Sequence, residues 1–164
     1  MARSALPGPD LPLDDREAAH LFCCVSFSGK TSSGGFGVVL RHLDHRKEIS
    51  GRVEQTSANQ MHLHAAVAAL SALRRRMKVH LYTTSSYARD GATRWIPGWR
   101  QRGWETAAGK SVQHRDLWEK IDGLNQRHEV SWHLVDREKN APAEVLAAKQ
   151  LSGQALRSPA REGA

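Results

Sequence analysis

The spacing of apolar residues follows a strand pattern first and a helical pattern afterwards. Runs of strand length lie at 20–27 (HLFCCVSF), 34–43 (GGFGVVLRHL) and 47–54 (KEISGRVE), which predicts an antiparallel meander. From Met61 the apolar residues recur at helical spacing, and this predicted helix ends at the basic run 74–76.

The second half of the chain alternates between strand and helix patterns. We expect strands at 78–85 (KVHLYTTS) and 129–135 (EVSWHLV), and helices at 86–96, 114–128 and 141–152. The order β-β-β-α-β-α-α-β-α predicts an α/β fold with one mixed sheet and helices on its faces. Residues 1–18 and 152–164 are patternless and predict disordered tails around a single domain at 19–151.

Length and composition agree with a single domain that has a real core. The chain has 164 residues, of which 40% are hydrophobic, and no apolar run approaches the ~20 residues needed to span a bilayer. The N-terminus lacks the apolar region of a secretory signal. Cys23 and Cys24 are neighbours that cannot easily bridge, which predicts reduced thiols in an intracellular compartment. We expect the cytoplasm, with an organelle matrix as the alternative.

Charge and aromatic content point to an acidic partner. The net charge is +7, and residues 94–110 interleave tryptophans with cations. These residues are Trp95, Trp99, Trp104, Arg94, Arg100, Arg102 and Lys110. One interpretation is a tryptophan-built minicore under a loop. The other, which the interleaving favours, is a surface where cations neutralise phosphates and rings stack on sugars or bases.

Several segments resemble the bacterial-type (type 1) ribonuclease H family. The segment RWIPGWRQRGWETAAGKSVQHRDLWEKIDGLNQRHEVSWHLV resembles its basic handle and the following helix and strand. TSANQMHLHAAVAALSAL is similar to the family's TNNRMELMAAIxAL, and LYTTSSYARDGATRWI to xxTDSQYVxxGIxxWI. The resemblance covers about residues 20–151. It implies a ribonuclease H-like fold: a five-stranded mixed sheet, an antiparallel meander then parallel strands, with flanking helices and a Trp-rich handle.

The same resemblance shows which catalytic groups differ. The family holds two Mg²⁺ ions with four carboxylates to cleave the RNA strand of an RNA/DNA hybrid. Here these positions hold Cys24 (or Ser26 with a shorter loop), His62, Thr84, and either Ala148 or Glu144. Glu144 fits better, because APAEVLAA copies the family's xxDELAxx. At least three carboxylates are replaced, so the expectation is a pseudoenzyme with no metal and no cofactor.

The binding residues that the resemblance implies are better kept. Besides the handle residues they include Asn59, Ser57 and His114. The sequence therefore predicts a catalytically inactive module that binds RNA, an RNA/DNA hybrid or ribosomal RNA, without a membrane partner. One alternative is a structural protein-protein subunit of a ribosome or another complex. A second, minor alternative is a residually active ribonuclease H.

Overall fold

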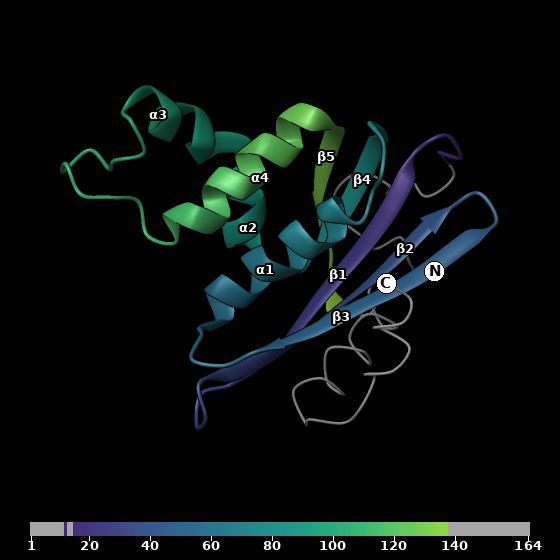
Figure 1. Cartoon of the computed structure of the whole chain (residues 1–164), viewed down its shortest axis with the longest axis horizontal. Coiled ribbons are helices and arrows are strands. Elements are labelled where there is room, and N and C mark those ends of the chain that lie inside the picture. Colours follow the sequence, from purple (N-terminus) through teal and green to yellow (C-terminus); the bar gives the residue numbers. More distant parts are fainter. Residues whose placement is uncertain (1–11, 13–14, 138–164) are drawn as a thin grey trace.

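Five strands form a single mixed sheet in this computed structural model, which describes residue 12 and residues 15–137 (Figure 1). The elements are β1 (Ala19–Ser28), β2 (Ser33–His42), β3 (His45–Val53), α1 (Ala58–Ser71), β4 (Lys78–Thr83), α2 (Ser86–Asp90), the π-helix η2 (Gly91–Trp95), α3 (Ile96–Gln101), α4 (Arg115–Arg127) and β5 (Glu129–Leu134). The strand order is β3-β2-β1-β4-β5.

The strand directions match the prediction. β1 pairs antiparallel with β2, and β2 with β3, whereas β4 runs parallel to both β1 and β5. The predicted mixed sheet, an antiparallel meander followed by parallel strands, is confirmed. β4 and β5 end next to one another, and both end level with the middle of β1, because β1 pairs with β4 only over its first four residues.

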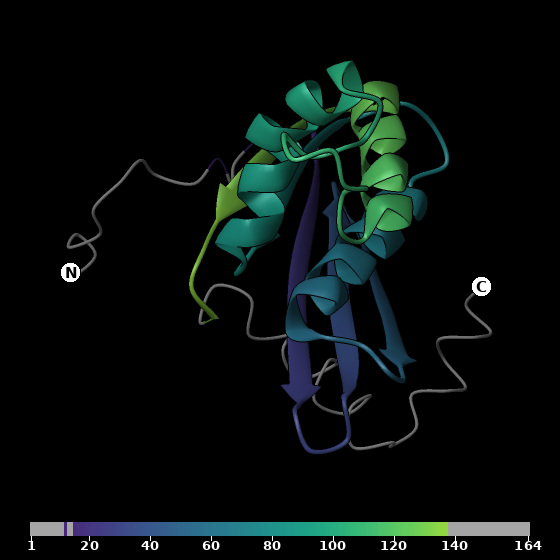
Figure 2. The same ribbon diagram turned by 90° about the vertical axis from the view of Figure 1, so that its left-hand side faces the viewer.

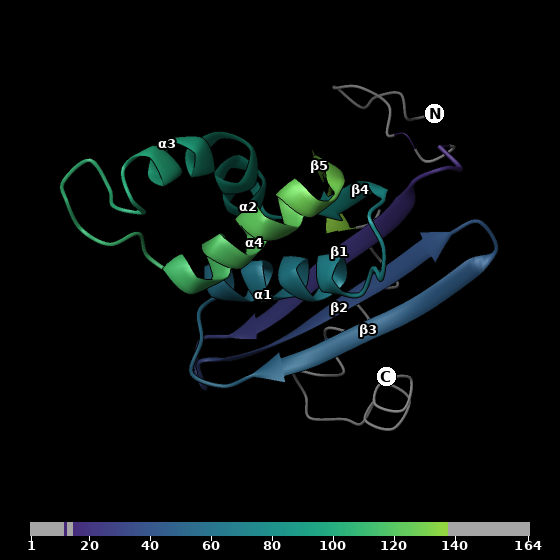
Figure 3. The same ribbon diagram turned by 45° about the horizontal axis from the view of Figure 1, so that its top comes forward.

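Helices α1 and α4 cover one face of this sheet, and the main core lies beneath them (Figures 2 and 3). α1 packs on β1 and β2 and also contacts α4. Its buried side includes Met61 and Leu70, which join Leu21 and Val38 of the strands in one apolar cluster. The burial of this stripe stabilises the helix on the sheet.

A continuous helical run connects β4 to the handle. α2, η2 and α3 follow one another without a break, so the helix predicted at 86–96 extends into the Trp- and Arg-rich segment. Gly91 starts the π-helix, and a Cβ at this position would lie 2.1 Å from Cη2 of Trp118. Glycine therefore permits the close approach of this run to α4, where Trp118 is completely buried.

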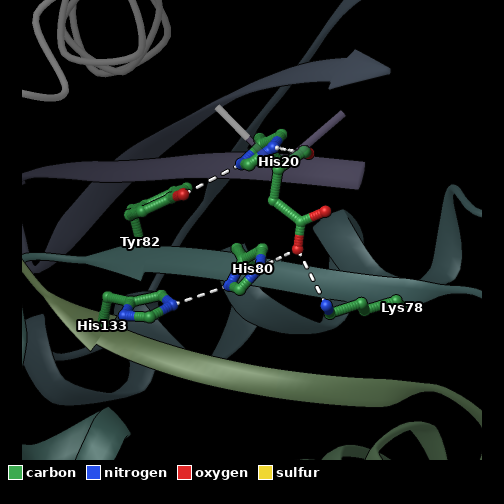
Figure 4. A network of polar contacts seen from close by, with 6 residues as sticks. His20, Lys78, His80, Tyr82 and His133 are labelled. Atoms are coloured by element: carbon green, nitrogen blue, oxygen red, sulfur yellow. Dashed lines mark hydrogen bonds and ion pairs between the residues drawn. The ribbon is translucent and has the colours of Figure 1, made fainter. Parts of the chain in front are cut away.

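Residues 15–18, which the prediction placed in the N-terminal tail, include a turn that is anchored on the sheet (Figure 4). The Asp15 carboxylate accepts hydrogen bonds from Lys78 Nζ and His80 Nε2, each at 2.9 Å. His20 Nε2 donates to the Asp15 carbonyl oxygen at 2.8 Å. The start of β1 is thereby fastened to the start of β4.

Two further hydrogen bonds extend this network across the sheet (Figure 4). His20 Nε2 carries its proton toward Asp15, so in the neutral ring Nδ1 accepts from the Tyr82 hydroxyl at 2.9 Å. Likewise, in neutral His80, Nδ1 accepts from His133 Nε2 at 2.9 Å. The rings also stack, with centroids 5.4 Å apart for His20 and His80. These contacts link β1, β4 and β5.

The remaining predictions about organisation meet the structure only in part. The predicted helix at 141–152 and the C-terminal tail lie outside the described residues. Cys23 and Cys24 are buried and form no disulfide. Within residues 15–137, no helix combines the length and the apolar character that a membrane span requires.

Candidate functional site

Three of the positions singled out as replaced carboxylates lie on β1, on α1 and directly after β4. The pairing between β1 and β4 ends at Phe22 and Tyr82. Cys24 and Thr84 each lie two residues beyond this last pair. His62 lies in the first half of α1, which packs across β1. The fold therefore brings these elements together at one edge. Glu144 and Ala148, the two candidates for the fourth position, lie outside the described residues.

The Cys24 side chain at this edge is buried and is not accessible at the surface. Cys24 is completely buried and contacts Val39 and Phe22 in a small apolar cluster on the sheet. Ser26, the other candidate for this position, is half-buried near the end of β1. Because burial in apolar surroundings disfavours a thiolate, Cys24 is poorly suited to ligate a metal ion.

His62 is held neutral. Burial and the nearby Arg137 guanidinium lower the pKa of His62 to about 4. At neutral pH it is therefore an uncharged imidazole, where a metal-binding carboxylate would carry a negative charge. The Arg137 side chain approaches β1 and donates from Nη1 to the carbonyl oxygen of Val25 at 3.5 Å.

The described residues do not fit the pair of Mg²⁺ ions that the resemblance implies. Mg²⁺ requires hard oxygen ligands in octahedral geometry. A buried thiol, a neutral imidazole and the Thr84 hydroxyl supply no charged oxygen, and a guanidinium lies close to the imidazole. Across residues 15–137, no three or more His, Cys, Asp or Glu side chains form a group that could hold a metal ion.

The handle tryptophans form an extension of the core with one exposed member. Trp118, from α4, is completely buried, and its indole N–H donates to the Tyr87 hydroxyl at 3.3 Å. Trp99 lies 5.4 Å from Trp118 and 6.3 Å from Trp104, between ring centroids. Trp95 keeps 38% of its surface exposed. The minicore interpretation thus describes Trp99 and Trp104. Trp95 also packs against Trp99 and Trp118 and offers the accessible part of the cluster.

The predicted cations of the handle differ in their partners. Arg100 forms a two-pronged ion pair with Asp122 on α4, with N···O distances of 2.7 and 3.3 Å. Arg94 and Lys110 are exposed, and Arg102 is exposed with its Nε donating to the Glu105 carbonyl at 3.3 Å. Arg100 therefore fixes the handle to the body of the protein, a role that the sequence prediction missed.

The other predicted binding residues lie at the amino-terminal ends of α1 and α4. The Ser57 hydroxyl caps α1 by accepting from the Gln60 N–H at 3.2 Å, and its own O–H remains a donor. Asn59 is exposed in the first turn of the same helix. His114 precedes α4 in the left-handed conformation, with φ of 60°, and its side chain makes no capping hydrogen bond.

His64 lies on a different side of α1 from His62. Burial, with Lys120 and His114 nearby, lowers the pKa of His64. Lys120 and His114 thus influence His64, whereas Arg137 influences His62. The sequence signal for this arrangement was the two-residue spacing, which separates the two side chains by about 200° around a helix.

Arg137 is the site residue that the sequence prediction missed. It follows β5 in the chain, and its neighbour Val135 is held to β4 by a hydrogen bond from Val135 N–H to the Thr83 carbonyl at 2.9 Å. No local pattern marks an arginine after a strand as a site residue. Its position near β1 follows from the strand order, which the local sequence around Arg137 does not show.

Comparisons with known proteins are consistent with this fold and identify its relatives. The family model RNase H matches residues 16–156. A protein from Alkalilimnicola ehrlichii named Ribonuclease H is 48% identical over 123 residues, or 73% of this chain and 84% of that relative. Another Ribonuclease H, from Halorhodospira halophila, is 40% identical over 143 residues, covering 87% of this chain and 95% of the relative.

Solved structures show the same architecture. The crystal structure of LC9-RNase H1, described as a type 1 RNase H with the type 2 active-site motif, superposes with a TM-score of 0.75 and 26% identity. The match covers 90% of this chain and 76% of that chain. LC11-RNase H1 in complex with an RNA/DNA hybrid superposes with a TM-score of 0.62 and 18% identity, over 82% of this chain and 97% of that one. This second similarity concerns the fold alone.

These relatives correct the functional prediction. The sequence interpretation was a catalytically inactive module and not an enzyme, and it is contradicted because relatives at 40–48% identity over most of their length are named Ribonuclease H. Their names indicate an enzyme. The prediction gave decisive weight to a few aligned positions, whereas the similarity extends over the whole domain.

Proposed function

Because the chain belongs to the ribonuclease H family, we propose that it binds RNA/DNA hybrids and cleaves their RNA strand. The observation that carries this proposal is the 48% identity to a Ribonuclease H over 84% of that relative's length. The family match at residues 16–156 supports it, since this range includes the whole sheet and the handle. We propose the cytoplasm as the compartment in which the protein acts.

The surface proposed for the hybrid runs from the handle to the start of α1. Trp95 offers an exposed ring for stacking on a sugar or base, and the exposed Arg94, Arg102 and Lys110 offer cations for phosphates. Asn59 and the Ser57 hydroxyl contribute neutral donors at the amino-terminal end of α1, where the helix dipole also favours an anion. Contacts of this type position a duplex without selecting its sequence.

At three aligned positions, Cys24, His62 and Thr84, the groups differ from the carboxylates of the family pattern. The described residues do not fit two Mg²⁺ ions, so we route no step through a metal. Because the groups of a catalytic site act as a unit, replacing several of them lowers the rate by orders of magnitude. We therefore expect cleavage far slower than that of a relative with all four carboxylates.

The test is a cleavage assay on a hybrid whose RNA strand carries an end label. The protein is prepared from a host without its own ribonuclease H, and the assay runs in Mg²⁺, in Mn²⁺ and in EDTA. The Alkalilimnicola relative serves as the positive control. We expect cleavage of the RNA strand in the hybrid and none in single-stranded RNA or in duplex DNA.

Two variants separate true activity from contamination. Glu144→Gln removes the carboxylate at the aligned fourth position, and we expect it to abolish cleavage. Trp95→Ala removes the partly exposed ring of the handle, and we expect weaker hybrid binding together with some loss of stability, because this ring also packs against Tyr87, Trp99 and Trp118. The proposal fails if the hybrid stays intact under all three conditions, or if both variants cleave as fast as the unchanged protein.

A further inference from the structure

The Arg137 side chain crosses the carboxyl edge of the sheet at the candidate site. Arg137 follows β5, and β4 lies between β5 and β1 in the sheet. Its guanidinium nevertheless contacts the Val25 carbonyl of β1, at 3.5 Å.

The neighbours of this guanidinium come from two elements. Val25 directly follows Cys24 on β1, and His62 on α1 is near enough to Arg137 for the charge to disfavour its protonation. Arg137 therefore lies near two of the described positions that align with family carboxylates. The described side chains at the aligned positions are neutral, and a positive side chain lies near them.

This exchange changes what the site can bind. Carboxylates recruit divalent cations, and the cations then contact the phosphate of the substrate. A guanidinium contacts a phosphate directly, because its planar N–H groups match two phosphate oxygens. It carries five donors, so a bond to Val25 is compatible with a simultaneous contact to an anion.

We propose that Arg137 binds a backbone phosphate of the nucleic acid at this edge directly, in place of a divalent cation. Arg137 is exposed, as a phosphate-contacting residue must be. The inference takes its natural ligand, the hybrid, from the proposed function. It adds that binding of the hybrid at this edge requires no metal.

A purely structural role for Arg137 predicts a different outcome. In that case the guanidinium only fastens the segment after β5 to β1, and its removal lowers stability without changing ligand binding. The 3.5 Å hydrogen bond to Val25 is one contact of this exposed side chain, and by itself it contributes little to stability. Binding measurements therefore separate the two roles.

The experiment measures binding of a fluorescent RNA/DNA hybrid by anisotropy, in EDTA and in Mg²⁺, over a range of salt concentrations. For the unchanged protein we expect the affinity in EDTA to be at least as high as in Mg²⁺, because Mg²⁺ competes for the phosphates. Arg137→Gln should weaken binding about tenfold and reduce the slope of log affinity against log salt by about one, as expected for one lost phosphate contact. Arg46→Gln is the matched control, since it removes one charge from an exposed ion pair on β3.

A second measurement uses inorganic phosphate in EDTA, followed by the NMR signal of the Val25 amide. Saturable shifts that Arg137→Gln abolishes would support the inference even if no hybrid were bound or cleaved, and the proposed function alone would then fail. Conversely, hybrid binding that requires Mg²⁺ would overturn the inference and leave the proposed function standing. Phosphate shifts that persist in Arg137→Gln would also overturn it.

Discussion

At the scale of single residues, the pKa of His62 depends on the nearby charge of Arg137. Burial is the larger cause of its low pKa of about 4, and the guanidinium is the second. We expect Arg137→Gln to raise the pKa of His62 while leaving it below 6.5, because burial remains. A pH titration of the imidazole signals by NMR measures this. His64 is the internal control, since its neighbours are Lys120 and His114.

The lowered pKa of His62 also predicts how stability depends on pH. The pKa of His62 is lower in the folded state than in the unfolded chain, so the unfolded chain binds more protons between about pH 6.5 and 4. The contribution of neutral His62 to the free energy of unfolding is therefore complete above pH 6.5. It decreases by up to about 3 kcal/mol as the pH drops toward 4. Arg137→Gln should reduce this loss. An unchanged His62 pKa in the variant would show that the guanidinium lies elsewhere.

Single residues also mark the limit of prediction from sequence. The pattern around His62 located it on a helix, and the resemblance located it at a former carboxylate position. Its neutral state and its neighbour Arg137 could not be predicted, because residues 62 and 137 meet only through the strand order β1-β4-β5. The sequence likewise showed no local signal that Arg100 pairs with Asp122 across 22 residues.

At the scale of elements, the Arg100–Asp122 ion pair holds α3 of the handle against α4. Asp122 is 8% exposed, whereas the Arg100 side chain is half-exposed, so the pair lies between the surface and buried cases. We expect Asp122→Asn to lower the free energy of unfolding by about 1–2 kcal/mol. Urea denaturation measures this. Glu119→Gln, which breaks an exposed pair with Arg115 on the same helix, should cost less than about 0.5 kcal/mol.

The pH dependence gives this prediction a second readout. Burial raises the pKa of Asp122, but hydrogen bonds from Arg100 and Gln126 outweigh it, and the net pKa lies below the usual value. The pair therefore stabilises the fold above about pH 4 and loses this effect as the pH falls through the lowered pKa. The difference in the free energy of unfolding between Asp122→Asn and the unchanged protein should become smaller in acid. Equal losses in the two variants at neutral pH would contradict the anchoring role.

Element boundaries show which physical signals sequence carries well. All five strands lie within two residues of their predicted ranges, because each apolar run ends at turn residues that also end the strand. α3 was not separated from the loop that follows it, since Pro97 and Gly98 disfavour a helix by propensity. In the structure Ile96, at the start of α3, is almost completely buried, and tertiary packing overrides this local preference.

At the scale of the whole molecule, fold and function depend on different amounts of sequence. The fold follows from patterns spread over more than a hundred residues, so no single replacement disturbs its prediction. The functional prediction depended on four positions, and it was wrong about the class of protein. The sequence identity of 40–48% extends over the handle, the sheet and the helices. It is therefore stronger evidence about function than those four positions.

The Asp15 network gives a prediction for the molecule as a whole, because it ties the N-terminal turn to the sheet (Figure 4). Hydrogen bonds from His80 and Lys78 hold the pKa of Asp15 well below its usual range. Its stabilising effect is therefore present above about pH 4 and is lost as the pH falls through the lowered pKa. We expect Asp15→Asn to lower the melting temperature at pH 7, with a difference that narrows in strong acid.

Thermal melts from pH 2 to pH 8 test this against a matched variant. Asp44→Asn removes the same charge from the exposed turn between β2 and β3, where Asp44 makes no ion pair with any residue that the structure describes. Net charge rises equally in both variants, so any general effect of charge on this basic protein is common to them. A melting profile of Asp15→Asn that coincides with that of Asp44→Asn would mean that the anchor contributes nothing to the fold. A selective loss for Asp15→Asn would place the folded boundary of the domain at or before residue 15.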